Sequence, residues 1–155
     1  DLVLAFMHNK GNIADSTLKS NSTAIGNYRD SVFQLSQTGQ YAVFSNFSLS
    51  STWNPSTTAT TNFVDSSRNK IAQSSNGNGI LVTTGTSETN KVMNIYDIAG
   101  NVYEWTLELT SSTYGPCASR GGFFYGAGSD DPAAFRGYNS TVLSDDSVGF
   151  RVSLF

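Results

Sequence analysis

The chain has 155 residues, a formal net charge of −3, and only nine Lys and Arg residues, scattered along its length. It therefore lacks the basic patch that displaces counterions from a phosphate backbone, and we expect no nucleic-acid partner. Apolar residues make up 38% of the chain and charged residues 14%, a balance typical of a folded domain and not of a disordered tail. No apolar run reaches the roughly 18 residues that span a bilayer, so we expect no membrane insertion.

The first predicted element is a helix that starts in the apolar run over residues 2–7 and ends at Gly11, where glycine can adopt the left-handed conformation. No capping residue and no initiator Met precede it, so we expect an N-terminal portion to be missing. Over residues 12–90, dense Ser, Thr, Asn and Gly predict long loops. Isolated apolar residues are expected to anchor these loops to a core: Tyr28, Phe33, Tyr41, Val43, Phe44, Phe47, Trp53 and Phe63.

Two strands are predicted in the second half of the chain. Apolar and polar residues alternate over 103–109 and over 148–154, the period-two pattern of a half-buried strand. We therefore expect Phe150 in the core and the chain end tied into a sheet. The stretches 121–128 and 137–147 are expected to be connections beside that sheet.

The sequence holds one cysteine, Cys117, and one histidine, His8. A single cysteine can form neither an intrachain disulfide nor a Cys-based metal cluster. We expect Cys117 to be a small residue packed near a strand and His8 to lie at a helix end.

Three motifs follow one another in the second half: GNVYEW at 100–105, RGG at 120–122 and VGFRV at 148–152. In this order they resemble the formylglycine-generating-enzyme (sulfatase-modifying factor) family. The resemblance implies an α+β, C-type-lectin-like fold with a small antiparallel sheet, few helices and many irregular loops. We expect residues 1–155 to be the C-terminal part of a single domain of this kind.

The family enzyme binds copper through two cysteines soon after the Gly-Gly motif and activates oxygen there. This sequence has Phe123, Phe124 and Tyr125 at that place and no cysteine after Cys117. Phenyl rings cannot replace the sulfur donors that a soft metal needs. We therefore expect no catalysis and no required cofactor. The alternative of a formylglycine-generating-type oxidase lacks its cysteines.

The chain is also similar to the variable proteins of diversity-generating retroelements, which share this fold and carry diversified residues at its C-terminal end. Adenine-directed mutagenesis of their Asn-type codons cannot yield Glu, Lys, Gln, Met or Trp. Residues 1–117 contain 15 of these five types, whereas residues 118–155 contain none. The composition thus favours a variable binding region over about residues 120–155.

This region combines rigid aromatic rings with adaptable Gly, Ser and Asn, as binding surfaces do. We expect Phe124 and Tyr125 to be exposed and leave Phe135 open between core and surface. The aspartates could instead form turns. The candidate ligand-binding residues are Phe123, Phe124, Tyr125, Asp130, Asp131, Phe135, Gly137, Tyr138, Asn139, Ser140, Leu143, Asp145, Asp146 and Ser147.

The family resemblance also implies a structural calcium ion around the first motif. Oxygen ligands on a tight turn suit a hard cation. The implied ligands are Asp97, Gly100, Asn101, Val102 and Glu104. The alternative is that Asn101 and Glu104 simply hydrogen-bond the turn. The sugar-binding motifs of true lectins, Glu-Pro-Asn and Trp-Asn-Asp, are absent, so the lectin likeness concerns the fold alone.

These features together favour a non-catalytic ligand- or receptor-binding domain. The expected ligand is a protein or surface receptor, and the expected location is a phage tail or a bacterial cell surface. A multivalent oligomer would compensate for weak single sites through avidity. The alternative is an invariant structural or decoration protein of a virion or cell surface with the same fold.

Overall fold

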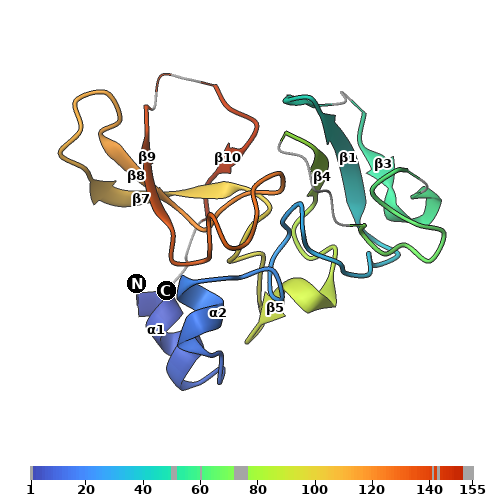
Figure 1. The fold of residues 1–155 in the computed structure, drawn as a ribbon, viewed down its shortest axis with the longest axis horizontal. Helices are drawn as coiled ribbons and strands as arrows, with labels where there is room; N and C mark the ends of the chain where they lie inside the picture. Colours follow the sequence, from blue (N-terminus) through green and yellow to red (C-terminus); the bar gives the residue numbers. More distant parts are fainter. Residues whose placement is uncertain are drawn as a thin grey trace.

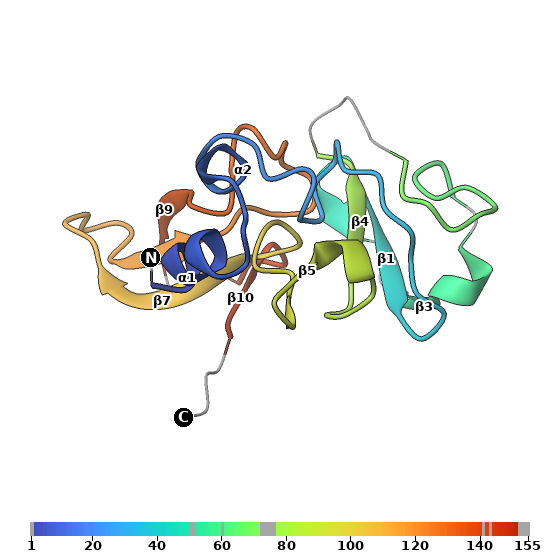
Figure 2. The ribbon, with the colours of Figure 1, turned by 90° about the horizontal axis from the view of Figure 1, so that it is seen from below.

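The computed structural model describes residues 2–49, 52–59, 61–71, 77–140, 142 and 144–151. Most regular elements in these residues are short, and two sheets lie toward opposite ends of the long axis with irregular loops between them (Figures 1 and 2). Two helices, α1 (Leu2–Asn9) and α2 (Asp15–Lys19), open the chain. Two 3-10 turns follow at Ser56–Thr58 and Glu88–Asn90.

The first sheet has the strand order β10-β7-β8-β9 and carries the C-terminal half of the chain. Its strands are β7 (Tyr103–Leu109), β8 (Cys117–Arg120), β9 (Arg136–Asn139) and β10 (Val148–Gly149). β7, β8 and β9 pair antiparallel, with Trp105 opposite Ser119 and Ser119 opposite Gly137. β10 runs parallel to β7, with Val148 opposite Tyr103. The closing motif is thereby placed beside the first motif.

The second sheet is built on β1 (Gln40–Ser45), which pairs antiparallel with β2 (Ser48–Leu49), β3 (Asn54–Pro55) and β4 (Gly79–Val82). A two-stranded ribbon, β5 (Lys91–Val92) and β6 (Ile95–Tyr96), precedes the first motif. The four residues of β4 are all buried, as expected for a short continuous apolar strand.

Three buried clusters form the core. One lies at the second sheet and includes Tyr41, Ile80 and Val82 with Phe33 and Phe63. A second joins both helices to the loops through buried side chains: Met7, Leu18, Ile25, Tyr28, Val92, Ala99 and Ala133. The third is small and consists of Phe44, Leu81 and Phe124. Because Phe124 belongs to the loop after the first sheet's β8, this third cluster joins the two sheets.

The predicted helix at the start is confirmed, but its predicted end at Gly11 is wrong. α1 ends at Asn9, and the left-handed residue that follows it is Asn12, with a φ of 54°. Asparagine tolerates this conformation better than most residues because its short polar side chain can hydrogen-bond locally. Gly11 is required for a different reason, since a Cβ there would lie 2.7 Å from the carbonyl oxygen of Met7.

The prediction of loops over residues 12–90 missed the second sheet and α2. Tyr28, Phe33, Tyr41, Phe44 and Phe63 are buried, which confirms them as anchors, and Val43 is partly buried. The other two predicted anchors, Phe47 and Trp53, are exposed. Short strands among Ser, Thr and Asn give little periodic signal, so they were hidden by the loop-like composition around them.

Both alternating patterns form strands, but two burial predictions are wrong. Leu107 and Leu109 in β7 are exposed, because this end of the strand lies beyond a register irregularity and pairs only with β8 among the described strands. Phe150 was expected in the core and is 78% exposed. It follows the end of β10, a two-residue edge strand, and so has no second sheet neighbour to cover it. Of the predicted final strand only Val148–Gly149 forms one, Phe150 and Arg151 are not in a strand, and residues 152–154 lie outside the described residues.

The predicted fold class is confirmed: the chain has a small α+β, C-type-lectin-like fold dominated by short strands and long loops. Among the described residues, no helix is long and apolar enough to cross a membrane.

Candidate functional site

The first motif forms a tight turn that brings three distant parts of the chain together. Gly100 and Asn101 both have left-handed backbones, with φ of 67° and 63°. A Cβ on Gly100 would lie 2.4 Å from the carbonyl oxygen of Asn27, so only glycine fits there. The amide N–H of Gly100 donates to Gly121, and the carbonyl of Asn101 accepts from the N–H of Phe124. The turn therefore fixes the loop that carries the predicted binding region.

The side chain of Asn101 is buried and fully hydrogen-bonded. Its amide nitrogen donates to the carbonyl of Val82 at 2.9 Å, and its oxygen accepts from the Val82 N–H at 3.0 Å. The same oxygen accepts from the amide of Asn27 at 2.9 Å. Asn27 in turn receives a hydrogen bond from the side-chain nitrogen of the buried Lys70. The side chain of Asn101 thus hydrogen-bonds two distant segments, at Asn27 and Val82, and holds the turn against them.

The buried side chain of Tyr28 holds the loop over residues 121–135 in place. Its buried hydroxyl lies 3.0 Å from the carbonyl oxygens of both Gly121 and Asp131, the two ends of the loop's first part. A Cβ on Gly122 would lie 2.1 Å from the Asp131 oxygen, so the loop closes on itself at a glycine. The loop is thus a packed and hydrogen-bonded platform.

Five aromatic side chains form a continuous row across this platform, and we call Phe135, Tyr103, Phe123, Tyr125 and Phe47 the aromatic row. The ring centroid of Tyr103 lies 5.7 Å from that of Phe135 and 4.5 Å from that of Phe123. Tyr125 lies 4.1 Å from Phe123 and 5.7 Å from Phe47. Four of the rings are half-buried and Phe47 is 63% exposed. The row therefore presents partly exposed aromatic surface in a fixed position.

Carboxylates flank the aromatic row at two places. Near one end, burial raises the pKa of the Tyr103 phenol, and the charge of Asp131 and a hydrogen bond with it add to the shift. Burial also raises the pKa of Asp131. Farther along, burial raises the pKa of Tyr125, and the charges of Asp145 and Asp146 raise it further. The two tyrosines of the row thus each lie close to aspartate side chains.

The predicted binding residues divide into three groups by exposure. Asp130, Tyr138, Asp145 and Asp146 are exposed. Phe123, Tyr125, Asp131, Phe135, Gly137, Asn139 and Ser140 are half-buried. Phe124 and Ser147 are buried, and Leu143 lies outside the described residues.

The prediction that Phe124 is exposed is wrong, and the reason is the direction of its ring. Phe124 is 0% exposed and packs edge-on against Phe44 at 4.8 Å, in the cluster that joins the two sheets. Ser147 is buried because its hydroxyl and N–H both bond Asp145 Oδ1, at 2.6 and 2.8 Å. Asp145 is therefore a turn former as well as a flanking charge.

Two members of the aromatic row, Tyr103 and Phe47, were not among the predicted site residues. Tyr103 was assigned to the first motif's strand, and the alternation over 103–109 places it on one face with Trp105. β7 pairs with β8, and β8 leads into the loop over residues 121–135, so the strand pairing connects this face to the loop. Phe47 comes from the turn between β1 and β2, where its ring lies against Gly77, and no sequence signal connects it to Tyr125.

Four of the five residues implied as calcium ligands line one cavity of about 270 Å³: Asp97, Asn101, Val102 and Glu104, together with Arg151. Asp97 Oδ2 accepts from the Gly85 N–H at 3.1 Å, while its buried Oδ1 makes no hydrogen bond of normal geometry. Burial raises the pKa of this carboxyl group, although the nearby Asn90 side chain lowers it in part. A carboxylate oxygen without a partner in a polar cavity fits a hard cation.

The remaining donors fit a cation less fully. The amide of Asn101 is already committed to hydrogen bonds, and Glu104 Oε1 accepts from the guanidinium of Arg151, with 2.8 Å to Nε. Arg151 also donates to the carbonyl of Asp97 at 3.2 Å. The set thus fits through Asp97 and Glu104, with Arg151 as a competing cation. Among the described residues, no three His, Cys, Asp or Glu side chains gather around one point.

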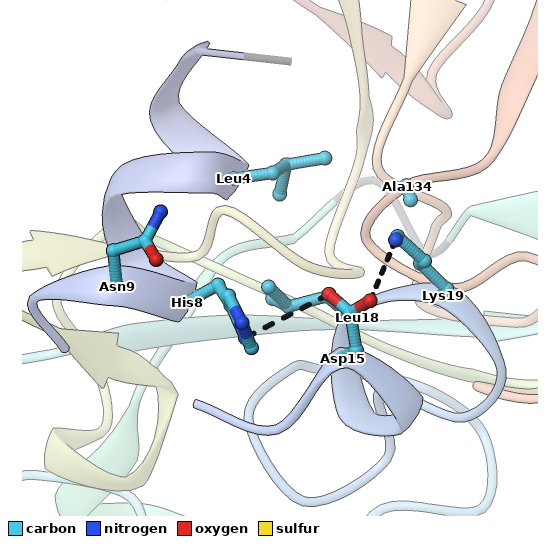
Figure 3. A pocket seen from close by; sticks show the side chains of 7 residues that line it. All are labelled: Leu4, His8, Asn9, Asp15, Leu18, Lys19 and Ala134. Carbon is cyan, nitrogen blue, oxygen red and sulfur yellow. Dashed lines mark hydrogen bonds and ion pairs between the residues drawn. The ribbon is translucent and has the colours of Figure 1, made fainter. Parts of the chain in front are cut away.

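A separate cavity of about 420 Å³ lies between α1 and α2 (Figure 3). Leu4, Leu18 and Ala134 line it together with the polar side chains of His8 and Asp15. His8 lies near the helix end, as predicted, and its Nδ1 is 2.9 Å from the carbonyl of Ile13. None of the predicted binding residues lines this cavity. Cys117, half-buried at the start of β8, lies by a strand as predicted.

The comparisons with known proteins gave one match. Residues 36–154 match the FGE-sulfatase model, described as the sulfatase-modifying factor enzyme 1-like domain. This segment includes both sheets, the first motif and the aromatic row. No curated protein and no solved structure matches the chain.

Proposed function

Because this chain belongs to the FGE-sulfatase family of sulfatase-modifying factor enzyme 1-like domains, we propose that it is a member that binds a partner and does not catalyse a reaction. The aromatic row carries this proposal. Its rings are packed by the scaffold before any partner arrives, so binding would cost little side-chain entropy. Tyr and Phe supply large rigid contact areas of the kind found at interface hot spots.

The residues after the Gly-Gly motif support the non-catalytic half of the proposal. Phe123 and Phe124 fill the space there, with Phe123 stacked on Tyr103 and Phe124 in the core. The chain has one cysteine, Cys117, which precedes that motif in β8. A pair of thiolates for copper therefore has no residues to form it in this chain.

We further propose that the partner-binding residues are diversified, as in the variable proteins of retroelements, and that the domain is displayed on a phage tail or a bacterial surface. The support is compositional: residues 118–155 contain none of the five amino acids that the mutagenesis cannot produce. Half-buried side chains on a hydrogen-bonded loop suit such a role, because they can change without loss of the scaffold. Display in several copies would raise the affinity of weak single sites.

Sequencing the same locus from related isolates tests this proposal. We expect Phe123, Tyr125 and Phe135 to vary, while Gly100 and Asn101, which hold the turn, stay constant. A reverse transcriptase gene and an imperfect repeat that differs at adenines should lie nearby. An unvarying C-terminal region without these neighbours would favour an invariant decoration protein instead.

A chemical assay tests the non-catalytic half separately. The purified chain is loaded with copper and incubated in air with a cysteine-containing sulfatase peptide, and the peptide mass is followed. We expect no conversion of cysteine to formylglycine. Conversion above that of a Cys117→Ser control would overturn the assignment.

A structural calcium ion is the second proposal about this region. Its support is the partnerless Oδ1 of Asp97 in the cavity shared with Glu104. When bound, the ion would take oxygen ligands from these two carboxylates and from backbone carbonyls of the turn, among them Gly100 and Val102. It would stabilise the turn on which the aromatic row rests.

A further inference from the structure

The faces of the aromatic row are suited to one kind of chemical group. Tyr103 and Phe123 are stacked 4.5 Å apart with an angle of 27° between their planes, and Tyr125 stands nearly perpendicular to Phe123 at 77°. Tyr125 is also stacked on Phe44 at 4.8 Å, so one face of its ring is covered, while Tyr103, Phe123 and Tyr125 each keep part of their surface exposed. Ring faces carry negative electrostatic potential and attract cations.

The charge around the row has one sign almost throughout. Residues 121–135 and 137–150 contain four aspartates, Asp130, Asp131, Asp145 and Asp146, and neither Lys nor Arg. Arg29 is the nearby cation, and its Nη2 lies 3.7 Å from Asp130 Oδ2. Arg29 also donates to the carbonyl of Tyr125 at 3.4 Å, and its charge offsets part of the rise that burial causes in the pKa of Asp131. Among the described residues, Asp145 and Asp146 form no ion pair, and they lie beside Tyr125.

The arginines of the neighbouring strands are bound elsewhere. Arg120 and Arg136 both contact Glu108, at 3.2 and 2.7 Å. Arg151 contacts Glu104. These cations are therefore not directed at the row, and its flanking carboxylates are left to attract a charge from outside the chain.

We propose that the aromatic row and its flanking carboxylates bind arginine or lysine side chains presented by a protein partner. This inference rests on the proposed binding function and specifies the partner's chemistry. A guanidinium can lie flat on a ring of Tyr103, Phe123 or Tyr125 while its N–H groups reach a carboxylate. A desolvated carboxylate such as Asp131 also gains from a counter-charge.

Peptide binding to the purified chain tests the inference directly. The probe is a short glycine–serine peptide carrying several arginines, and the matched probe carries citrulline, which keeps the shape but lacks the charge. We expect the citrulline peptide to bind at least about tenfold more weakly, in line with the loss of one ion pair and one cation–π contact. Binding of the arginine peptide should weaken as salt is raised.

Variants locate the site. Asp131→Asn combined with Asp145→Asn should weaken arginine-peptide binding by about tenfold, since a carboxylate is removed beside each tyrosine of the row. Phe47→Ala should weaken it as well, and this exposed ring can be removed without opening the core. Tyr114→Leu is the matched control, because Tyr114 is 90% exposed in the connection between β7 and β8, outside the row.

Equal binding of the arginine and citrulline peptides, or no binding of either, would overturn the inference. An unchanged affinity in the double aspartate variant would do the same. None of these results depends on whether the locus is diversified, so the proposed function is judged by its own experiment. Conversely, an invariant locus together with charge-dependent peptide binding would reject diversification and would still support a partner with basic side chains.

Discussion

Asn101 and Asn27 lie 74 positions apart in the chain, yet the amide of Asn27 donates a 2.9 Å hydrogen bond to the side-chain oxygen of Asn101. The backbones are joined as well, since the N–H of Asn101 donates to the carbonyl of Asn27 at 2.8 Å. Through Val82 the same side chain holds the end of β4. One polar residue of the first motif thus ties the N-terminal segment, the second sheet and the loop over residues 121–135 together.

Replacing Asn101 by alanine is therefore expected to destabilise the fold strongly. The variant leaves the Val82 N–H and C=O and the Asn27 amide buried with lost partners, and each such group costs about 1–3 kcal/mol. We expect the free energy of unfolding to fall by at least about 3 kcal/mol, measured by urea denaturation. Asn9→Ala, at an exposed position at the end of α1, is the matched control and should change it by less than about 0.5 kcal/mol. Equal losses in the two variants would contradict the role assigned to Asn101.

The sequence predicts the parts of the site that depend on local patterns. The alternation over 103–109 places β7 correctly, and the three ordered motifs lead to the correct fold class and family. The burial of Asn101 did not follow from a pattern, because its partners Asn27 and Val82 are distant in sequence and neither is part of a recognised motif. A polar residue in a turn motif is expected at the surface unless such partners are known.

The adjacent aromatics 123–125 show a second limit. All three are aromatic residues with similar secondary-structure propensities, and only the path of the loop decides which ring enters the core. The hydrogen bond from the Phe124 N–H to Asn101 and the packing against Phe44 turn Phe124 inward. Phe123 instead stacks on Tyr103 in the aromatic row, and Tyr125 contacts both Phe123 and the buried cluster, where it stacks on Phe44. Lys70 is similar: nothing in its local sequence shows that it is buried next to Asn27 and Tyr28.

Two glycines with similar backbones provide a matched test of the loop's closure. Gly122 and Gly85 have φ of 78° and 80°, but a Cβ would meet the Asp131 oxygen at 2.1 Å in the first and nothing within 4 Å in the second. Gly85→Ala should lower the free energy of unfolding only by the strain of a left-handed backbone, about 1–2 kcal/mol. Gly122→Ala adds a steric clash with backbone, so we expect a loss of more than about 3 kcal/mol in urea denaturation. Similar losses in the two variants would show that the loop opens without cost.

Lys70 makes the free energy of unfolding depend on pH in the alkaline range. Burial lowers the pKa of Lys70 well below the usual lysine value. Above the usual lysine value, the amine is neutral in both the folded and the unfolded chain. As the pH falls, the unfolded chain binds a proton while the folded chain does not, and stability is lost. We therefore expect the free energy of unfolding to rise with pH between the lowered pKa of folded Lys70 and the usual lysine value, and we read this rise below the range in which tyrosines of the unfolded chain ionise.

Lys70→Met removes this proton and should flatten that rise, whereas the exposed Lys10→Met should leave it intact. Chemical denaturation at a series of pH values measures both. Loss of the hydrogen bonds to Asn27 and Tyr28 also lowers overall stability, so the slope with pH and not the absolute value is the readout. A slope unchanged in Lys70→Met would assign the pH dependence to another group.

Calcium should raise the melting temperature of the wild-type chain relative to chelator, because an ion that binds the folded state alone stabilises it. Asp97→Asn should abolish the effect: its amide oxygen can still accept from the Gly85 N–H, but the partnerless charged oxygen is gone. Asp146→Asn, an equal charge change at an exposed position outside the cavity, should retain it. Arg151→Gln should enlarge it, since Glu104 then loses its competing guanidinium. Magnesium at equal concentration should act more weakly, because it demands stricter geometry and keeps its waters. A wild-type melting temperature that calcium leaves unchanged would show that Arg151 alone supplies the positive charge at this turn.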